Sequence, residues 1–118
     1  MKTKIVTLLF SVMFSMTFAQ VKKIKRKDIS EINPEWRLIK TVSNTYGIVG
    51  YNDKIIVQPI YSKIEKYGEY KEDLALVKGI AGTYGFIDKS GKEVIPVRYD
   101  LQEIKSGFSA LYKKHIVK

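Results

Sequence analysis

An internal repeat of 38 residues is the feature that most constrains how this chain can fold. When the sequence is shifted by 38 positions, three blocks match: 38–40 with 76–78, 45–49 with 83–87, and 56–57 with 94–95. The register then slips by about three residues, and 74–78 resembles 109–113. A period of this length is typical of tandem architectures in which each copy is one supersecondary unit. We therefore expect two full units and the opening strand of a third.

Each unit has the residue pattern of short β-strands. Apolar and polar residues alternate in 37–42 and 74–78, while β-branched and aromatic residues dominate 45–49 and 83–87. Gly91 is placed to take the positive φ of a hairpin loop, and Asn52 and Asp53 take its place in the first unit. The sequence therefore predicts an all-β fold: tandem short antiparallel strands and hairpins built from about two 38-residue repeats.

We expect the chain to end in a strand over residues 108–113, because this segment resembles an earlier predicted strand. No segment beyond residue 20 shows a long helical period. Two units and a fraction lie close to the smallest number of repeats that is stable alone, so self-association through an open sheet edge is a further expectation. A related hypothesis is that the chain pairs with a longer repeat protein.

The first 19 residues have the three zones of a secretory signal peptide. Lys2 and Lys4 form a basic start, residues 5–18 carry no charge, and Thr17 and Ala19 are small residues that a signal peptidase accepts. The uncharged run is shorter than the roughly 18 residues or more of a spanning helix. We therefore expect cleavage after Ala19, a periplasmic or secreted protein, and no membrane span in the mature chain. A retained membrane anchor is the alternative.

The net charge of +9 does not belong to the repeat body. Residues 45–112 hold nine Lys or Arg and nine Asp or Glu, so the excess lies in the flanking segments. A nucleic-acid interface needs basic residues clustered on the domain itself, and we expect no nucleic-acid partner. We assign residues 20–36 to a solvated basic linker and 37–118 to the repeat domain. Alternatively, the basic run at 22–27 contacts an anionic membrane or cell-wall surface.

The second unit carries an ordered motif. It reads Val77-Lys78, Tyr84-Gly85-Phe86-Ile87-Asp88, Gly91-Lys92, Ile95-Pro96 and Tyr99-Asp100. This motif closely resembles the WG-repeat family, and the resemblance covers roughly residues 38–113. The defining Trp-Gly pair is Tyr-Gly in both units, which keeps a large flat ring. The resemblance implies a β-rich tandem module of the kind that exported bacterial proteins carry, with no catalytic residues to transfer. It supports an interaction or scaffold role by analogy.

The residues needed for common catalytic and metal sites are scarce. The chain has no cysteine, and its single histidine, His115, lies near the C-terminus, so we expect neither a zinc site nor a histidine-based catalytic site. Asp88 and Asp100 occupy repeat positions where turn hydrogen bonds explain a carboxylate. We therefore expect no enzyme activity, no catalytic or metal-binding residues and no cofactor. The alternative is a small carboxylate-dependent hydrolase of envelope glycans.

Tyr67 and Tyr70 are the candidate contact residues. They lie in the connection that breaks the repeat register and have no counterpart in the other unit, whereas four other tyrosines recur with the repeat. Aromatic residues on such a loop are candidates for contact with a protein or a glycan. The sequence thus favours a non-catalytic module that binds a protein or a cell-envelope component.

Overall fold

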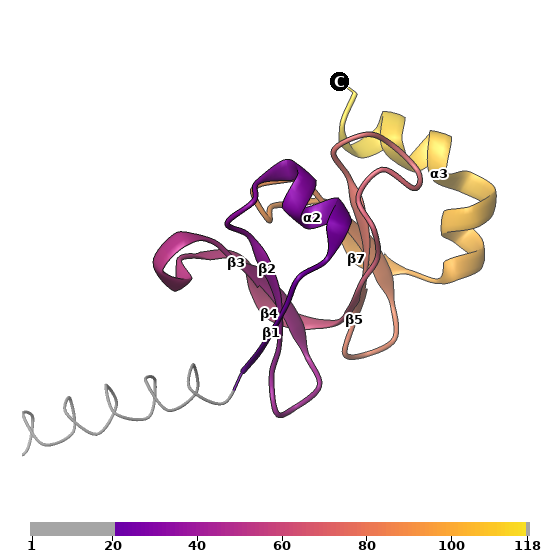
Figure 1. Cartoon of the computed structure of the whole chain (residues 1–118). Helices are drawn as coiled ribbons and strands as arrows, with labels where there is room; N and C mark the ends of the chain where they lie inside the picture. Colours follow the sequence, from indigo (N-terminus) through magenta and orange to yellow (C-terminus); the bar gives the residue numbers. More distant parts are fainter. Residues whose placement is uncertain (1–20, 118) are drawn as a thin grey trace, which may run out of the picture.

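Seven strands pair in the order in which they occur along the chain, and every neighbouring pair is antiparallel (Figure 1). The computed structural model describes residues 21–117. The strands are β1 (Lys22–Ile24), β2 (Arg37–Lys40), β3 (Tyr46–Val49), β4 (Ile55–Ile64), β5 (Ala75–Gly79), β6 (Tyr84–Ile87) and β7 (Glu93–Tyr99). The remaining elements are helices α2 (Lys27–Ile32) and α3 (Leu101–His115) and a 3-10 turn, η1 (Tyr51–Asp53). The predicted sheet of short antiparallel strands from two repeats is confirmed.

The 38-residue repeat is reproduced in the strand register. One unit comprises β2, β3 and the first part of β4, and the other comprises β5, β6 and β7. Equivalent pairs are Leu38 with Ile48 and Leu76 with Phe86, and Tyr46 with Tyr61 and Tyr84 with Tyr99. A register shift interrupts the second hairpin of each unit immediately after its tyrosine, at Gly47 and Gly85. The two units therefore share not only a sequence pattern but the same bulge.

Tyr61 lies where the two units join. It pairs with Tyr46 on one side and with Gly79 on the other, because the long strand β4 pairs first with β3 and then with β5. The side chain of Tyr61 is 4 % exposed and belongs to a core that also holds Val57 and Val77. The hydrophobic core thus extends across the junction between the two units.

The loop of the second unit packs on the strand of the first. Gly91 has a φ of 85°, and a Cβ atom there would lie 2.2 Å from the carbonyl oxygen of Ile56. The hydroxyl of Tyr61 donates to Glu93 at 2.7 Å, next to this loop. Only glycine fits this conformation and this close approach, so the loop position predicted from the sequence also serves as the contact between units.

The expectation of a strand over residues 108–113 is wrong, because this segment belongs to helix α3. The helix begins at a capping box, in which Asp100 accepts from the Glu103 amide and the Glu103 side chain accepts from the Asp100 amide. Ile104 is fully buried, and Phe108 packs against Phe86 with ring centroids 5.0 Å apart and the rings tilted by 60°. Apolar residues at intervals of three and four carried this helical signal. The similarity of residues 109–113 to an earlier strand obscured it.

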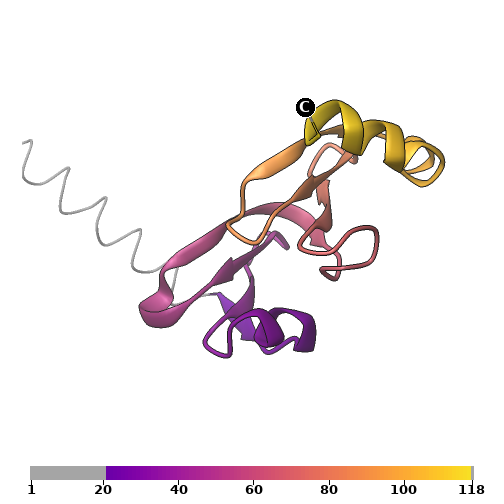
Figure 2. The same cartoon turned by 90° about the horizontal axis from the view of Figure 1, so that it is seen from above.

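Helix α3 packs against β6 and β7 at the end of the sheet (Figure 2), where a next unit would follow β7. In the first unit, Tyr61 donates its hydroxyl hydrogen bond to Glu93 of the following unit. In the second unit, the equivalent Tyr99 bonds instead to His115 of α3, with 2.8 Å between the hydroxyl oxygen and Nε2. Terminal repeats need such a cap because their apolar face otherwise meets water.

The segment expected to be a linker is part of the fold. Residues 22–32 form β1 and α2, and Ile29 of α2 is fully buried in the core of the first unit. Arg26 donates to the carbonyl oxygens of Ile64 at 2.6 Å and Glu65 at 3.0 Å, which fixes the segment to the end of β4. The folded domain therefore begins near residue 22 and not at residue 37. The signal peptide expected at 1–19 lies outside the described residues.

Candidate functional site: the hairpin tips

Two hairpin tips with the same backbone geometry project from one side of the sheet (Figure 1). The Thr41 amide donates to the Thr45 carbonyl oxygen, and the Gly79 amide donates to the Thr83 carbonyl oxygen. Positive φ angles follow at Asn44, 62°, and at its repeat equivalent Gly82, 95°. Each tip is therefore a closed turn, and the same turn occurs at the equivalent position of both repeats.

Each tip presents an aliphatic side chain to solvent at the same repeat position. Val42 is 73 % exposed and Ile80 is 75 % exposed. Ile60, which precedes the junction residue Tyr61 on β4, is 52 % exposed. Single exposed aliphatic residues are ordinary on a protein surface. Here, however, equivalent ones recur on two neighbouring tips, with a third on the strand between them.

Basic residues lie at the base of both tips. The strand register places Lys40 opposite Tyr46 and Lys78 opposite Tyr84. We call the following set the tip surface: Val42, Ile60 and Ile80 with Lys22, Lys40, Lys63, Lys78 and Arg98. Lys22 pairs with Lys40 along β1 and β2, and Lys63 pairs with Lys78 along β4 and β5.

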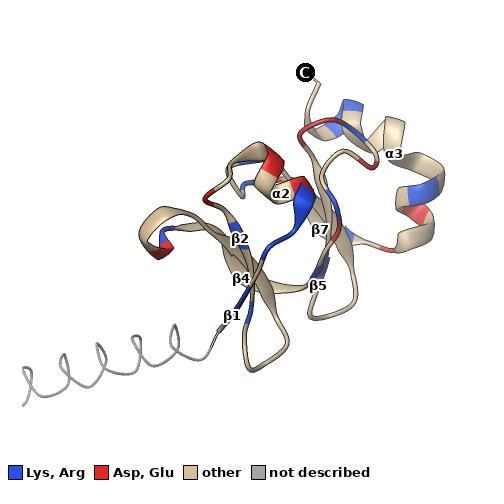
Figure 3. Ribbon diagram, viewed as in Figure 1, with Lys and Arg blue, Asp and Glu red and all other residues tan. Residues whose placement is uncertain are grey.

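Acidic residues are segregated from the tips (Figure 3). No Asp or Glu occurs in 36–52, 54–64, 74–87 or 94–99, stretches that include both hairpin tips and nearly all of β2 to β7. The acidic residues of the body lie in α2, in the loops at the other ends of the strands and in α3. Glu65 approaches the tip surface and pairs with Lys63 at 3.1 Å. The repeat body has no net charge, but its basic and acidic residues are therefore unevenly distributed over its surface.

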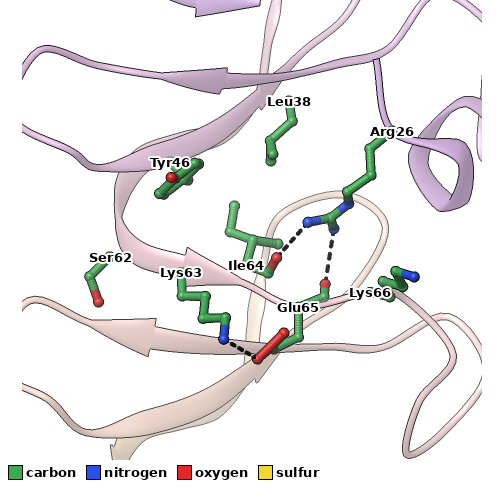
Figure 4. A pocket seen from close by; sticks show the side chains of 8 residues that line it. All are labelled: Arg26, Leu38, Tyr46, Ser62, Lys63, Ile64, Glu65 and Lys66. Atoms are coloured by element: carbon green, nitrogen blue, oxygen red, sulfur yellow. Dashed lines mark hydrogen bonds and ion pairs between the residues drawn. The ribbon is translucent and has the colours of Figure 1, made fainter. Parts of the chain in front are cut away.

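A concavity beside the tip surface is built by the N-terminal segment against β4 (Figure 4). It has a volume of about 350 Å³ and is lined by Arg26, Leu38, Tyr46, Ser62, Lys63, Ile64, Glu65 and Lys66. The guanidinium group of Arg26 is engaged by the β4 carbonyl oxygens and by the Asp28 carboxylate at 2.7 Å. The guanidinium group of Arg26 therefore stabilises the fold and is not directed at a ligand in this concavity.

Tyr67 and Tyr70, the contact residues expected from the sequence, are half-buried within the molecule. The Tyr67 hydroxyl donates to the carbonyl oxygen of Asp88 at 2.9 Å. Burial raises the pKa of Tyr67 well above its ordinary value, and the charges of Asp88 and Asp28 add to the effect. Tyr70 packs edge-on against Phe86 at 5.4 Å. The two rings thus join the loop 65–74 to different cores and are not brought together.

The carboxylates considered for catalysis are held by local hydrogen bonds. The Asp88 side chain accepts from the Ser90 amide at 2.9 Å and the Lys92 amide at 3.1 Å, and it closes the loop. Burial alone would raise the pKa of Asp88, but the hydrogen bonds from Ser90 and Lys92 outweigh it and lower the pKa. Asp100 caps α3. Each carboxylate therefore has a structural task in a turn or a cap.

His115 takes part in the contact between α3 and β7. Partial burial lowers its pKa, and the nearby charges of Lys114 and Arg98 act in the same direction. Within residues 21–117, no group of three or more histidine or acidic side chains is arranged to hold a metal ion. Over the same residues, no helix is long and apolar enough to cross a membrane.

A family comparison decides what the two units are. The model of the WG containing repeat matches residues 46–78 and 84–101. The chain carries WG repeats. Each match begins at the tyrosine of a Tyr-Gly pair, in β3 or in β6, which is one strand later than the start of each structural unit described above. No similar protein was found among curated proteins, and none was found among solved structures.

The WG repeats also explain why sequence reasoning missed the tip surface. In these repeats, the loops that join the strands ending in Ile39-Lys40 and Val77-Lys78 to the following Tyr-Gly strands are short. The available signal was periodic: Lys40 and Val42 recur as Lys78 and Ile80, 38 residues later. A count of charge by segment hid the segregation, because neighbouring residues in one segment lie at opposite ends of the strands.

Proposed function

We propose that the protein is an exported, non-catalytic interaction module that binds its partner through the tip surface. The observation that carries this proposal is the recurrence of an exposed aliphatic residue beside a lysine on two tips of identical turn geometry. Exposed aliphatic and charged residues on fixed loops are typical of interaction sites. The partner is a protein or a component of the cell envelope.

The structure gives the hydrolase alternative less support. Glycan hydrolysis needs two carboxylates that face a common substrate, one of them free to act as an acid. Asp88 and Asp100 instead accept hydrogen bonds from their own turn and helix end. An enzyme would lose turnover of envelope glycan in Asp88→Asn and Asp100→Asn variants that remain folded. If the variants are less stable and the parent protein itself shows no turnover of envelope glycan, the result agrees with the interaction module.

Photo-cross-linking in the exporting cell tests the proposed contact. A photoreactive amino acid replaces Val42 or Ile80, and the control places it at Tyr51, which is 71 % exposed and lies in the loop at the other end of the strands. We expect adducts from positions 42 and 80 and none from position 51. Adducts from position 51 alone, or equal yields at all three positions, would contradict the proposal.

Export is tested with the same material. Mass spectrometry of the protein recovered from outside the cytoplasm gives its N-terminal residue, which we expect to be Gln20.

The hypothesis that Tyr67 and Tyr70 contact a partner stays a prediction. If replacing both leaves the cross-linking yields at positions 42 and 80 unchanged, their role is the internal packing described above.

A further inference from the structure

We infer that the partner of the tip surface is an anionic lipid bilayer, which the protein binds peripherally. This inference rests on the proposed function and names its partner. It starts from the order of side chains along each tip. Val42 and Ile80 stand outermost, and Lys40 and Lys78 lie two residues further back on their strands, about 7 Å along a strand.

Two tyrosines, Tyr46 and Tyr84, lie at the same level as these lysines. Tyr46 is opposite Lys40, Tyr84 is opposite Lys78, and all four side chains are half-buried. The ammonium group of Lys78 lies 5.7 Å from the centre of the Tyr84 ring. Proteins that enter a bilayer interface place aliphatic groups deepest, with tyrosine and lysine at the level of the headgroups. Both tips have this order.

The charge of the surface matches an anionic membrane. Among residues 21–117, no carboxylate forms an ion pair with Lys22, Lys40, Lys78 or Arg98, whereas Lys63 pairs with Glu65. Each basic side chain near an anionic leaflet adds to the attraction, and the effect falls off within a Debye length. The hairpin tips themselves, residues 41–45 and 79–83, contain no acidic residue, although Asp100 follows Tyr99 close to the base of the second tip.

The shape of the surface favours a bilayer over a folded protein. Val42, Ile60 and Ile80 do not line the concavity between Arg26 and β4; Val42 and Ile80 stand on the hairpin turns and Ile60 lies on β4. A protein partner would have to supply a matching pocket for each tip. A bilayer interface accepts two protruding aliphatic side chains without such pockets, because lipids rearrange around them.

Vesicle binding tests this inference, with the protein purified in the form that the cell exports. Sedimentation compares vesicles of phosphatidylcholine with vesicles in which about a third of the lipid is phosphatidylglycerol. We expect binding to the anionic vesicles that weakens as salt increases. The variant Lys40→Gln/Lys78→Gln should bind at least about tenfold more weakly, since each lysine contributes about fivefold. Val42→Ser/Ile80→Ser should weaken binding by a similar factor.

Two matched controls separate the tip surface from net charge and net hydrophobicity. Lys54→Gln/Lys92→Gln changes the charge equally at a pair of repeat-equivalent positions in the opposite loops. Tyr51→Ser removes an exposed ring there. Both should bind like the parent protein, and circular dichroism checks that all variants are folded.

Four results would overturn the inference. One is equal loss of binding in the tip and control variants, and another is equal binding to both kinds of vesicle. The third is no vesicle binding together with a protein adduct at positions 42 and 80 in the cell. This last result rejects the lipid partner and leaves the interaction module standing. An absence of adducts and of vesicle binding rejects both.

Discussion

The glycine of each Tyr-Gly pair is fixed by the backbone that crosses it. A Cβ atom on Gly47 would lie 2.5 Å from the carbonyl oxygen of Val57, and one on Gly85 would lie 2.5 Å from that of Ile95. Real Cβ atoms do not approach backbone oxygens this closely. The tyrosine beside it is less constrained, because a half-buried ring can be exchanged for another flat ring. This difference explains why the glycine is retained in both units while tyrosine stands in place of tryptophan.

A Gly85→Ala substitution tests this constraint. The added methyl group has to displace the backbone of β7, so we expect a loss of about 1–3 kcal/mol in the free energy of unfolding. The matched control is Gly107→Ala, a position where nothing lies within 4 Å of the added atom. Gly107 lies at a kink in α3, where its φ of −129° suits alanine, so that variant should change the free energy of unfolding by less than about 0.5 kcal/mol. Urea denaturation measures both, and equal stabilities would contradict the constraint.

The Tyr67 hydroxyl predicts how stability changes in alkali. Burial raises the folded-state pKa of Tyr67 above the value of about 10 for an unfolded chain. The stabilisation is therefore complete below pH 10 and is lost as the pH rises further, because the unfolded chain ionises first. Tyr61 acts in the same direction through burial and Glu93. We expect unfolding to require less urea at pH 11 than at pH 9.

A Tyr67→Phe variant isolates the contribution of this hydroxyl. It lacks the hydrogen bond to Asp88 and should lose about 1 kcal/mol at pH 9. Its stability should then fall less steeply than that of the parent protein above pH 10. Tyr51→Phe, at an exposed ring, is the control and should follow the parent curve. If the Tyr67→Phe and parent curves are parallel, the hydroxyl does not carry the pH dependence.

At the scale of elements, helix α3 replaces a missing third unit. Leu76, Phe86 and Ile95 are the equivalents of Leu38, Ile48 and Val57, whose face is covered by the following unit. In the last unit, α3 covers this face with Ile104 and Phe108. Two units are close to the lower limit of stability for repeat arrays, so this cover matters for the whole fold.

An Ile104→Ala substitution tests the role of the helix as a cap. The side chain is fully buried, and its loss should cost about 2–5 kcal/mol. The exposed Lys105→Ala serves as the control in the same turn and should change stability by less than about 0.5 kcal/mol. Thermal unfolding followed by circular dichroism compares them. A small effect of Ile104→Ala would show that the second unit does not depend on α3.

The elements differ in how far the sequence could predict them, for physical reasons. The strands and the Gly91 loop were predictable, because alternation and turn residues act locally and occur twice. α3 was missed because a local resemblance was weighed above the spacing of Leu101, Ile104 and Phe108. The segment around Arg26 was missed because its basic residues suggested solvent, while the partners of Arg26 lie 38 and 39 residues away. The tip surface depends on pairing between strands, which composition does not encode.

At the scale of the whole molecule, the two units form one cooperative body. The core of the first unit includes Ala75, Val77 and Ile87 of the second. Hydrogen bonds from Tyr61 and Tyr67 to the segment 88–93 cross the same junction. In repeat proteins, stability is the sum of unit terms and of the interface between neighbours. With two units, one interface carries all of the coupling.

A Gly91→Ala substitution weakens that interface and predicts how unfolding proceeds. The position has a positive φ, and its added methyl group would collide with the Ile56 carbonyl oxygen of the first unit. We expect a loss of about 2 kcal/mol or more. Two probes follow the two ends: fluorescence of Trp36, which packs on the core of the first unit, and the helical signal near 222 nm, to which α3 contributes most. In the parent protein both transitions should coincide. In Gly91→Ala, the Trp36 transition and the helical transition should both shift to milder denaturing conditions by the same amount, because the interface couples the two units. A helical transition that separates from an unchanged Trp36 transition would show instead that the first unit is stable without its neighbour.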